Sequence, residues 1–573
     1  MPAPDYRVPP PPRRTLIPEA ESAPPHDIQP CPEPRWWISK SPEERMMDTE
    51  SRNQDALKAP TDDRPEPSST TEMLRFLRTY AQNFLNSRLM DERRSLPPAL
   101  IAEFAEVGLL GLQIPPDLGG QNLSHADINR VFTQLGAIDA NLAVFCAVHN
   151  TLGVAPILLS ATDEVKGCVL PRLAAGQALT TSAISEPGIG SHVRGMTTSA
   201  TRNPDGSYTI KGAKKWISLG GDARYVNIFA GLRDERGRPV GITGFLADSR
   251  TPGFDIGPEM LTLGLRAVPQ YDLTFNNLKV PPSALLGAEG DGLATAKSAF
   301  MGGRAVLAAM AMGASMRSLE LAQRFTKGRE VATGSLAENG RIREVLAEAA
   351  YAIQAVETLT ARIATWRDAG QNVPDAWYFC AKILGCELAW KAIDTALQIL
   401  GARGFLDTNT VGQHFRDYRL FRIFEGSTEA ITVYLGTTMV RHPDEFTRLV
   451  HRTRPATAVL RLIDQVAEIG TDRPDDAPGR HIHAAVVGEL VCWSLLASVT
   501  SEAAARSAMD GYTASWTEHQ LRSRLRSARL GSQRDLPTQA EFDQHVAGYA
   551  HAIGDVDQRR WPAEEWRADP LLR

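Results

Sequence analysis

The sequence has few cysteines, a small net charge and no obvious apolar run long enough to cross a membrane. Its six cysteines are scattered and form no Cys-x-x-Cys pair, which argues against a disulfide framework and predicts no metal site. A net charge of −5 argues against a general nucleic-acid or membrane-surface binder. No continuous apolar stretch reaches the roughly 18 residues that a span needs. We therefore expect a cytoplasmic protein with reduced thiols.

What the sequence does contain is enough for several folded domains. Its 573 residues, 43% hydrophobic and 23% charged, are typical of a globular chain with about three or four domains. Residues 1–70 are the exception, because they hold 16 of the 38 prolines and few aliphatic side chains. Such a segment buries too little apolar surface to offset its chain entropy, so we predict a disordered tail.

The spacing of apolar residues changes along the rest of the chain. Residues 71–177 and 286–442 repeat apolar positions at helical spacing, whereas residues 178–285 contain short runs typical of strands. A further block, residues 443–573, is helical again and includes Ala484–Met509, which is predicted as one long helix. The predicted fold is therefore mainly α with a middle β domain.

One short motif places a carboxylate between an aromatic ring and a glycine, in Phe424-Glu425-Gly426-Ser427. The ring excludes water, and glycine lets a ligand approach the backbone closely. A glutamate held in this way could have a raised pKa and serve as a base. Taken alone, such a motif is more often a solvated surface segment, so its weight depends on the other segments that agree with it.

Several motifs occur in the order and spacing of one enzyme family. They are Gly108–Gly120, Ser185–Ser191, Lys215–Ser218, Gly303-Arg304, Gln398–Gly404 and Phe424–Ser427. On these residues the chain resembles the acyl-CoA dehydrogenase family over about residues 75–440. The resemblance implies an N-terminal helical domain, a β-barrel-like middle domain and a C-terminal four-helix bundle, here followed by an extra helical block.

The same resemblance implies FAD as the cofactor. The flavin would lie between the β domain and the bundle, and its adenine half would reach a neighbouring subunit, so a homodimer or homotetramer is implied. The residues that the resemblance assigns to FAD are Ser182, Ser185, Gly190, Ser191, Trp216, Ile217, Ser218, Arg329, Gln398, Gly401, Ala402, Ser427 and Glu429.

The family reaction removes an α-proton and a β-hydride from an acyl thioester, which is either acyl-CoA or an acyl-carrier protein. By resemblance, Glu425 is the base, flavin N5 accepts the hydride, and Gly426 leaves room for the substrate. The residues implied near the substrate are Ser191, Met301, Arg304 and Gly426. The sequence does not specify the electron acceptor.

Some positions depart from the family pattern, including His192, Met301, Ala332 and Ala402. Together with the tail and the extra block, these departures suggest a specialised relative. We hypothesise a natural-product pathway enzyme that acts on a carrier-protein thioester, with the arginines between residues 522 and 534 docking the acidic carrier. A solvated basic helix face explains those arginines equally well. An oxidase that uses oxygen and a catalytically silent carrier-binding scaffold are the alternatives.

Overall fold

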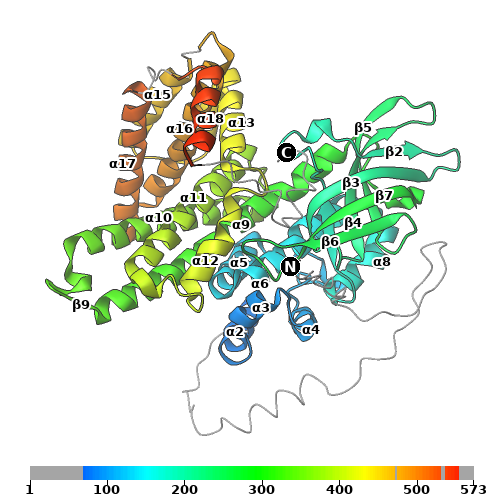
Figure 1. Cartoon of the computed structure of the whole chain (residues 1–573), viewed down its shortest axis with the longest axis horizontal. Helices are drawn as coiled ribbons and strands as arrows, with labels where there is room; N and C mark the ends of the chain where they lie inside the picture. Colours follow the sequence, from blue (N-terminus) through cyan, green and yellow to red (C-terminus); the bar gives the residue numbers. More distant parts are fainter. Residues whose placement is uncertain (1–68, 472–473, 531–535, 554–573) are drawn as a thin grey trace, which may run out of the picture.

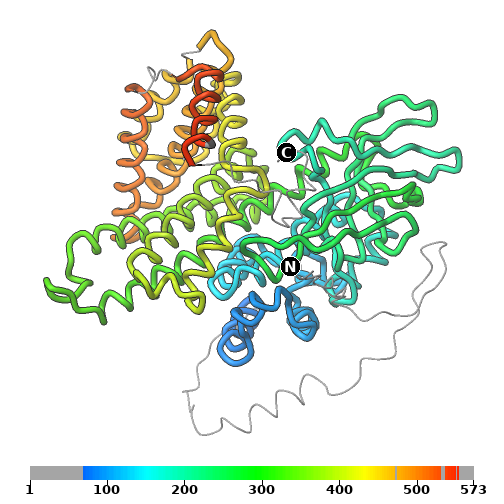
Figure 2. The backbone as a smooth tube through the Cα atoms, viewed as in Figure 1, coloured from blue at the N-terminus to red at the C-terminus, as the bar shows by residue number. Residues whose placement is uncertain are grey.

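The computed structural model describes residues 69–471, 474–530 and 536–553. The predicted disordered tail lies outside these residues, except for Ser69 and Thr70, which begin the first helix. Figure 1 shows the β domain on one side of the molecule, with the N-terminal helices against it and a helical bundle extending away from it. Figure 2 shows the last helices, in orange and red, stacked over the yellow-green helices of the bundle.

The N-terminal domain consists of short helices with polar caps. The Ser124 hydroxyl accepts a hydrogen bond from the Asp127 amide at 3.1 Å, and Asp139 accepts two amides at the start of the next helix. The chain then passes through a π-helix, η2, which lies beside the candidate site. The helical elements are α2 (Ser69–Asn83), α3 (Ser87–Arg93), α4 (Pro98–Glu106), α5 (His125–Ile138), α6 (Ala140–Ala147), η2 (Val148–Val154), α7 (Ala155–Ser160) and α8 (Asp163–Ala174).

The middle domain is one eight-stranded sheet with its own apolar core. Along the sheet the order is β6-β7-β3-β2-β4-β5-β8, and β1 pairs in parallel with β4. The core consists of the inward-facing residues of these strands, such as Val226, Phe245 and Phe275. The strands are β1 (Thr180–Ala183), β2 (Ser199–Arg202), β3 (Tyr208–Ser218), β4 (Tyr225–Arg233), β5 (Pro239–Asp248), β6 (Phe254–Met260), β7 (Gln270–Val280) and β8 (Leu285–Leu286).

The bundle is built around one long helix, α9. At Gly136 of α5 and Gly313 of α9 the two helices approach so closely that a Cβ at either position would overlap the backbone of the other helix. The region predicted as helical also contains a small hairpin of β9 (Glu330–Val331) and β10 (Gly334–Ser335), which follows α9. The helices are α9 (Gly292–Gly328), α10 (Gly340–Asp368), α11 (Asp375–Leu400), α12 (Thr410–Tyr418) and α13 (Thr428–Arg441).

The C-terminal block is helical, as expected, but the single helix predicted for residues 484–509 is wrong in its bounds. The helix begins earlier, because Asp476 caps it and Pro478 stands in its first turn, and it ends at Ala503. A second helix then begins at Ala508. The helices are α14 (Pro443–Val450), α15 (Thr457–Thr471), α16 (Ala477–Ala503), α17 (Ala508–Leu530) and α18 (Gln539–Ile553).

Three helical stretches are long and apolar enough to cross a membrane by length and composition. They are Ala140–Ser160, Gly292–Gly328 and Ala477–Ala503, so the expectation that the chain contains no such stretch is wrong by this measure. In the fold, 83%, 72% and 72% of their most apolar windows are buried. Their apolar character is explained by the cores that they form.

The block is joined to the bundle where α13 crosses α16. A Cβ on Gly488 would overlap the carbonyl oxygen of Thr432, and one on Gly436 would overlap the carbonyl of Ala484. Glycine is therefore required on both helices for this close approach. The contact attaches the C-terminal block to the helix that begins directly after the Phe424–Ser427 motif.

We predict that Gly488→Ala lowers the thermal midpoint, because the added methyl group forces α13 and α16 apart, at a cost of about 1–3 kcal/mol. The matched control is Gly167→Ala, in the middle of α8, where an added Cβ meets nothing within 4 Å. That substitution should stabilise the helix by up to about 1 kcal/mol. Scanning calorimetry of both variants tests the prediction, and equal midpoints would contradict it.

Candidate active site

Glu425 lies in the short connection between the 3₁₀ turn η7 (Leu420–Arg422) and α13. Its φ is 56° and that of Gly426 is 94°, so two consecutive residues have left-handed backbone conformations. A non-glycine residue rarely adopts this conformation, and such strain is concentrated at functional sites. Residue 426 must be glycine, because of its φ and because a Cβ there would come within 2.7 Å of the Ile431 side chain.

Two cations hold the backbone on either side of this residue. Arg304 donates from Nε and Nη2 to the Glu425 carbonyl, each at 3.3 Å, and its guanidinium lies 5.0 Å from the centre of the Phe379 ring. Lys382, which is fully buried, donates from Nζ to the carbonyl of Gly426 and, at 3.4 Å, to that of Arg422. Both cations therefore bind carbonyls of the loop and leave the carboxylate available for a ligand.

Burial raises the pKa of Glu425, while the nearby charges of Arg304 and Lys382 lower it and offset part of that rise. A carboxylate must be ionised to accept a proton. Its activity as a base is therefore expected to rise as pH increases through this raised pKa. The pKa of Lys382 is itself lowered, chiefly by burial.

Glu425 lines a small cavity of about 20 Å³. The other lining residues come from α6, η2, α9 and the turn before Glu425, and almost all are apolar. They are Val144, Ala147, Val148, Thr151, Leu152, Gly303, Leu307, Met310 and Phe424. The space beside the carboxylate is therefore small and apolar, and apolar surroundings favour a raised pKa.

The β domain reaches this cavity through η2. Ser182 on β1 donates to the Leu152 carbonyl at 2.5 Å, and the Asn227 amide on β4 donates to the carbonyls of Leu152 and Gly153 at 3.2 and 2.8 Å. These bonds satisfy backbone groups that the irregular helix leaves free. Asn227 is a site residue that the sequence analysis missed, since its role depends on a contact 74 residues distant.

Trp216 stands at a break in the sheet. The β3–β7 pairing shifts register between Lys214 and Ile217, Trp216 has a φ of 59°, and 45% of its side chain is exposed. A bulge of this kind re-aims a side chain out of the strand. The neighbouring Ser218 hydroxyl is bonded to the Gln270 amide at 2.7 Å. The structure thus presents a large aromatic face at the end of β3, as a stacked flavin would require.

Ser185 lies in the segment that joins β1 to β2, and its carbonyl accepts the Lys215 amide at 2.9 Å. Beyond it, Gly190 and Ser191 are exposed, and an added Cβ at Gly188 or Gly190 would meet nothing within 4 Å. Open backbone beside an exposed aromatic ring is a suitable cradle for a flat cofactor. These residues therefore fit FAD.

A buried ion pair anchors that segment and was not singled out in the sequence. Glu186 accepts from the amides of Thr197 and Thr198, at 2.6 and 3.0 Å, and lies 3.0 Å from Lys214 Nζ. Burial alone would raise the pKa of Glu186, but these hydrogen bonds and the charge of Lys214 outweigh it and lower the pKa to about 2. The carboxylate is therefore ionised and positions the loop; it is not available as a base.

The remaining FAD residues predicted from the sequence lie elsewhere. Arg329 follows the last turn of α9, and Gln398, Gly401 and Ala402 lie at the end of α11; all four are exposed. In Figure 1 the hairpin label β9 marks this end of the bundle, opposite the β domain. A helix of 37 residues, the length of α9, is about 55 Å long. Within one chain these residues are not brought to Trp216.

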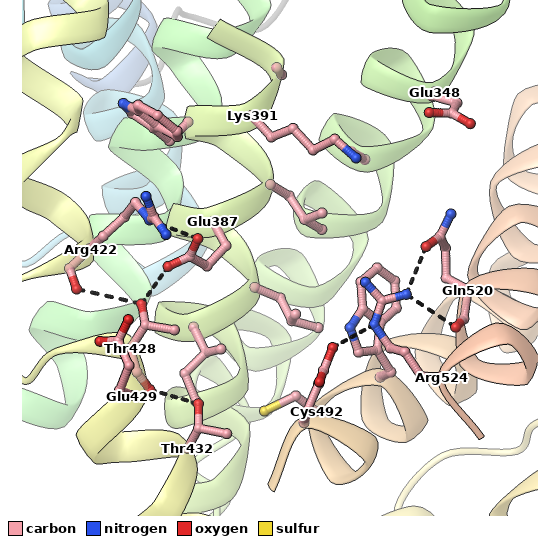
Figure 3. Close-up of a pocket in the computed structure, with 18 of the residues that line it drawn as sticks. Glu348, Glu387, Lys391, Arg422, Thr428, Glu429, Thr432, Cys492, Gln520 and Arg524 are labelled. Atoms are coloured by element: carbon pink, nitrogen blue, oxygen red, sulfur yellow. Dashed lines mark hydrogen bonds and ion pairs between the residues drawn. The ribbon is translucent and has the colours of Figure 1, made fainter. Parts of the chain in front are cut away.

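Two further predicted residues begin α13. Ser427 caps the helix, its hydroxyl accepting the Ala430 amide at 3.3 Å, and Glu429 lines a large cavity that faces the C-terminal block. Figure 3 shows Glu429 beside Thr428 and Thr432 on this wall.

Among the residues predicted near the substrate, Met301 is buried, and its sulfur lies 3.1 Å from Arg304 Nη1.

Comparison with known proteins identifies the fold. The acyl-CoA dehydrogenase N-terminal, middle and C-terminal domain models match residues 69–177, 181–278 and 290–439. The chain belongs to the acyl-CoA dehydrogenase family. The predicted fold class is confirmed, and the family supports the prediction of FAD.

Two curated relatives illustrate the extent of the likeness. The acyl-CoA dehydrogenase of Bacillus subtilis is 31% identical over 62% of this chain and 94% of its own length. The mitochondrial very long-chain specific acyl-CoA dehydrogenase of Rattus norvegicus is 32% identical over 58% of this chain. The chain spans about half of the rat protein's length, 51%.

Two solved structures add to this. Butyryl-CoA dehydrogenase from Megasphaera elsdenii is 27% identical, with 66% of this chain and all of that one covered at a TM-score of 0.62. An acyl-CoA dehydrogenase from Bacillus anthracis, solved with FAD, covers 83% of this chain and 90% of its own at a TM-score of 0.72. At 19% identity the second shows the fold alone. Its wider coverage extends that likeness beyond the three matched domains.

We predict that Lys382→Met raises the pKa of Glu425 further, because a buried positive charge beside the carboxylate is lost. In a plot of kcat/KM against pH, the fall in activity at low pH should then occur about one pH unit or more higher. The exposed Lys211→Met is the matched control and should leave this fall in place. An unshifted fall in folded Lys382→Met protein would remove Lys382 from this positioning role.

Proposed function

We propose that this chain catalyses the FAD-dependent α,β-dehydrogenation of a short-chain acyl thioester, with Glu425 as the base that removes the α-proton. The observation that carries the proposal is the position of Glu425. It is a strained residue with a raised pKa, beside a small apolar cavity, and its backbone is held by two cations.

Each residue of the site has a separate role in the proposed reaction. Glu425 accepts the α-proton, and the apolar cavity excludes the water that would otherwise compete for it. Arg304 and Lys382 bind the backbone carbonyls of the loop, which fixes the direction of the carboxylate, and their charges offset part of the rise in its pKa that burial causes. Bound flavin supplies the hydride acceptor, which is the cofactor's own chemistry. Trp216 and the open segment around Gly190 would hold its ring.

The separation of the predicted FAD residues supports an oligomer. Trp216 and Ser185 lie at the β domain, whereas Arg329 and Gln398 lie at the other end of the bundle. One flavin can contact both groups only if they come from different copies of the chain. We therefore propose a homodimer, or a homotetramer made from dimers, with FAD at the contact.

The size of the cavity supports a short acyl group. A volume of about 20 Å³ is at most about twice that of one water-sized probe, so we expect this part of the site to take only the end of a short acyl group. Leu307 and Met310 of α9 close the cavity. The M. elsdenii relative, named for butyryl-CoA, agrees with a substrate of this size.

A carrier-protein substrate receives less support from the structure. Of the predicted docking arginines, Arg522 pairs with Glu518 at 2.6 Å, Arg524 with Glu489 at 2.8 Å and Arg529 with Glu468 at 3.6 Å. Most of these arginines are therefore already paired with carboxylates of the C-terminal block. Arg534 lies outside the described residues. The carrier substrate, its natural-product pathway, the electron acceptor and a cytoplasmic location stay predictions.

We predict that Glu425→Gln keeps its bound flavin but reduces it at least about a hundredfold more slowly on anaerobic mixing with butyryl-CoA, because the amide cannot accept the proton. Stopped-flow absorbance at the flavin band measures this, with the exposed Glu164→Gln as control. Similar bleaching in both variants would contradict the assignment. Stoichiometric peroxide release in air would make the enzyme an oxidase.

We predict that Leu307→Ala shifts the preferred acyl chain to a longer one, because removal of the side chain deepens the cavity beside Glu425. The measurement is kcat/KM over an even-numbered series from butyryl- to dodecanoyl-CoA. Leu159→Ala, at an exposed leucine of α7, should leave the series unchanged. A wild-type preference for long chains would overturn the short-chain proposal while leaving the role of Glu425 intact.

A further inference from the structure

A large cavity lies between the bundle and the C-terminal block. Its volume is about 890 Å³, and its walls come from α10, α11, α13, α16 and α17 (Figure 3). It shares no lining residue with the cavity beside Glu425. Its size is that of a site for a whole small molecule. No reaction assigned to Glu425 uses this space.

Apolar side chains form most of the wall. Aliphatic groups project from both sides, and three indole rings lie among them. These apolar residues include Ile383, Leu388, Val486, Trp390, Trp493 and Trp516. An occupant must therefore be largely apolar, since a polar molecule would lose its hydration without regaining hydrogen bonds.

The charges inside the cavity are mostly neutralised by each other. Arg422 lies 2.7 Å from Glu387, and Arg524 lies 2.8 Å from Glu489, with its guanidinium 4.0 Å from the Trp493 ring centre. Figure 3 shows Arg422 with Glu387 on one wall of the cavity and Arg524 on the opposite wall. They offer little to a highly charged ligand. The polyphosphate part of a CoA ester would find no matching set of free cations here.

Three charged groups on the wall have no ion pair in the described part of the chain, namely Lys391, Glu348 and Glu429. Lys391 extends from α11 toward α10, where Glu348 stands. Its ammonium group can pair with one anionic group, whereas the two carboxylates disfavour a ligand with more negative charge. The chemistry is that of a long apolar chain that carries one anionic oxygen group.

The cavity wall is also bonded to the loop that carries Glu425. Thr428 donates to Glu387 at 2.6 Å, and the Arg422 carbonyl accepts from Lys382, the residue that also binds the Gly426 carbonyl. An occupant that touches Glu387 or Arg422 therefore contacts groups only one or two steps from the base. These hydrogen bonds join the cavity wall to the loop that carries Glu425.

We propose that this cavity is a second binding site, distinct from the thioester site, for a long-chain fatty acid, whose chain lies among the apolar residues and whose carboxylate faces Lys391. The proposal is independent of the reaction assigned to Glu425, since binding can be measured without turnover.

The test uses the tryptophans that line the cavity. A dibrominated stearate should quench part of the intrinsic fluorescence of the full-length holoprotein with a saturable curve, because bromine quenches indoles at contact. Unlabelled stearate should reverse the effect, whereas hexanoate and CoA should not. Glu425→Gln should bind equally well. Absence of saturable quenching, or its reversal by butyryl-CoA, would overturn the proposal.

Two variants locate the site. Ala349→Phe, which fills the space from α10, should abolish the saturable quenching, and circular dichroism shows whether the variant is folded. Lys391→Glu changes an exposed side chain, so the fold is preserved, and should weaken binding about two- to fivefold. Unchanged affinity in both variants would place the fatty acid elsewhere and refute the proposed site.

Discussion

The candidate active site depends on the way the buried Lys382 and the partly buried Arg304 bind the backbone around Glu425. Arg304 and Lys382 donate to loop carbonyls, and no ion pair joins either of them to the carboxylate in the described part of the chain. Direct ion pairs would lower the pKa of the glutamate strongly and block its oxygens. Because the two cations bind carbonyls of the loop, their charges offset part of the rise in pKa that burial causes, and the carboxylate oxygens of Glu425 stay free for a ligand. The cations also stabilise a left-handed backbone that Glu425 would not adopt alone.

Three layers of the protein converge on this loop, and each contributes one constraint. The β domain fixes η2 through Ser182 and Asn227, and η2 forms one wall of the small cavity. Helix α9 supplies Arg304 and the closing residues Leu307 and Met310. The closeness of α5 to α9, made possible by glycines, keeps that wall near the base. Burial, cavity size and pKa therefore have a common structural origin.

The fold class and the identity of the central carboxylate could be predicted from motif order and spacing, because each motif reports a local conformation. The features that give the site its properties could not. Lys382 meets a carbonyl 44 residues away, and Asn227 meets one 74 residues away, so neither contact has a local signature. The bounds predicted for the helix at residues 484–509 are wrong for a local reason. The alanine-rich apolar pattern continues past the end of α16, and the residues that start the helix, Asp476 and Pro478, lie before the apolar run.

The C-terminal block bears on the chemistry because it holds α13. That helix begins two residues after Gly426, and along its length it contacts α11 on one side and α16 on the other. Gly436 and Gly488 allow the α13 and α16 backbones to meet, so α13 cannot shift without disturbing the block. A shift of α13 would move Thr428 relative to Glu387 and carry the loop with it. The block is thus part of the support for the base, because it holds the helix that follows the Glu425 loop.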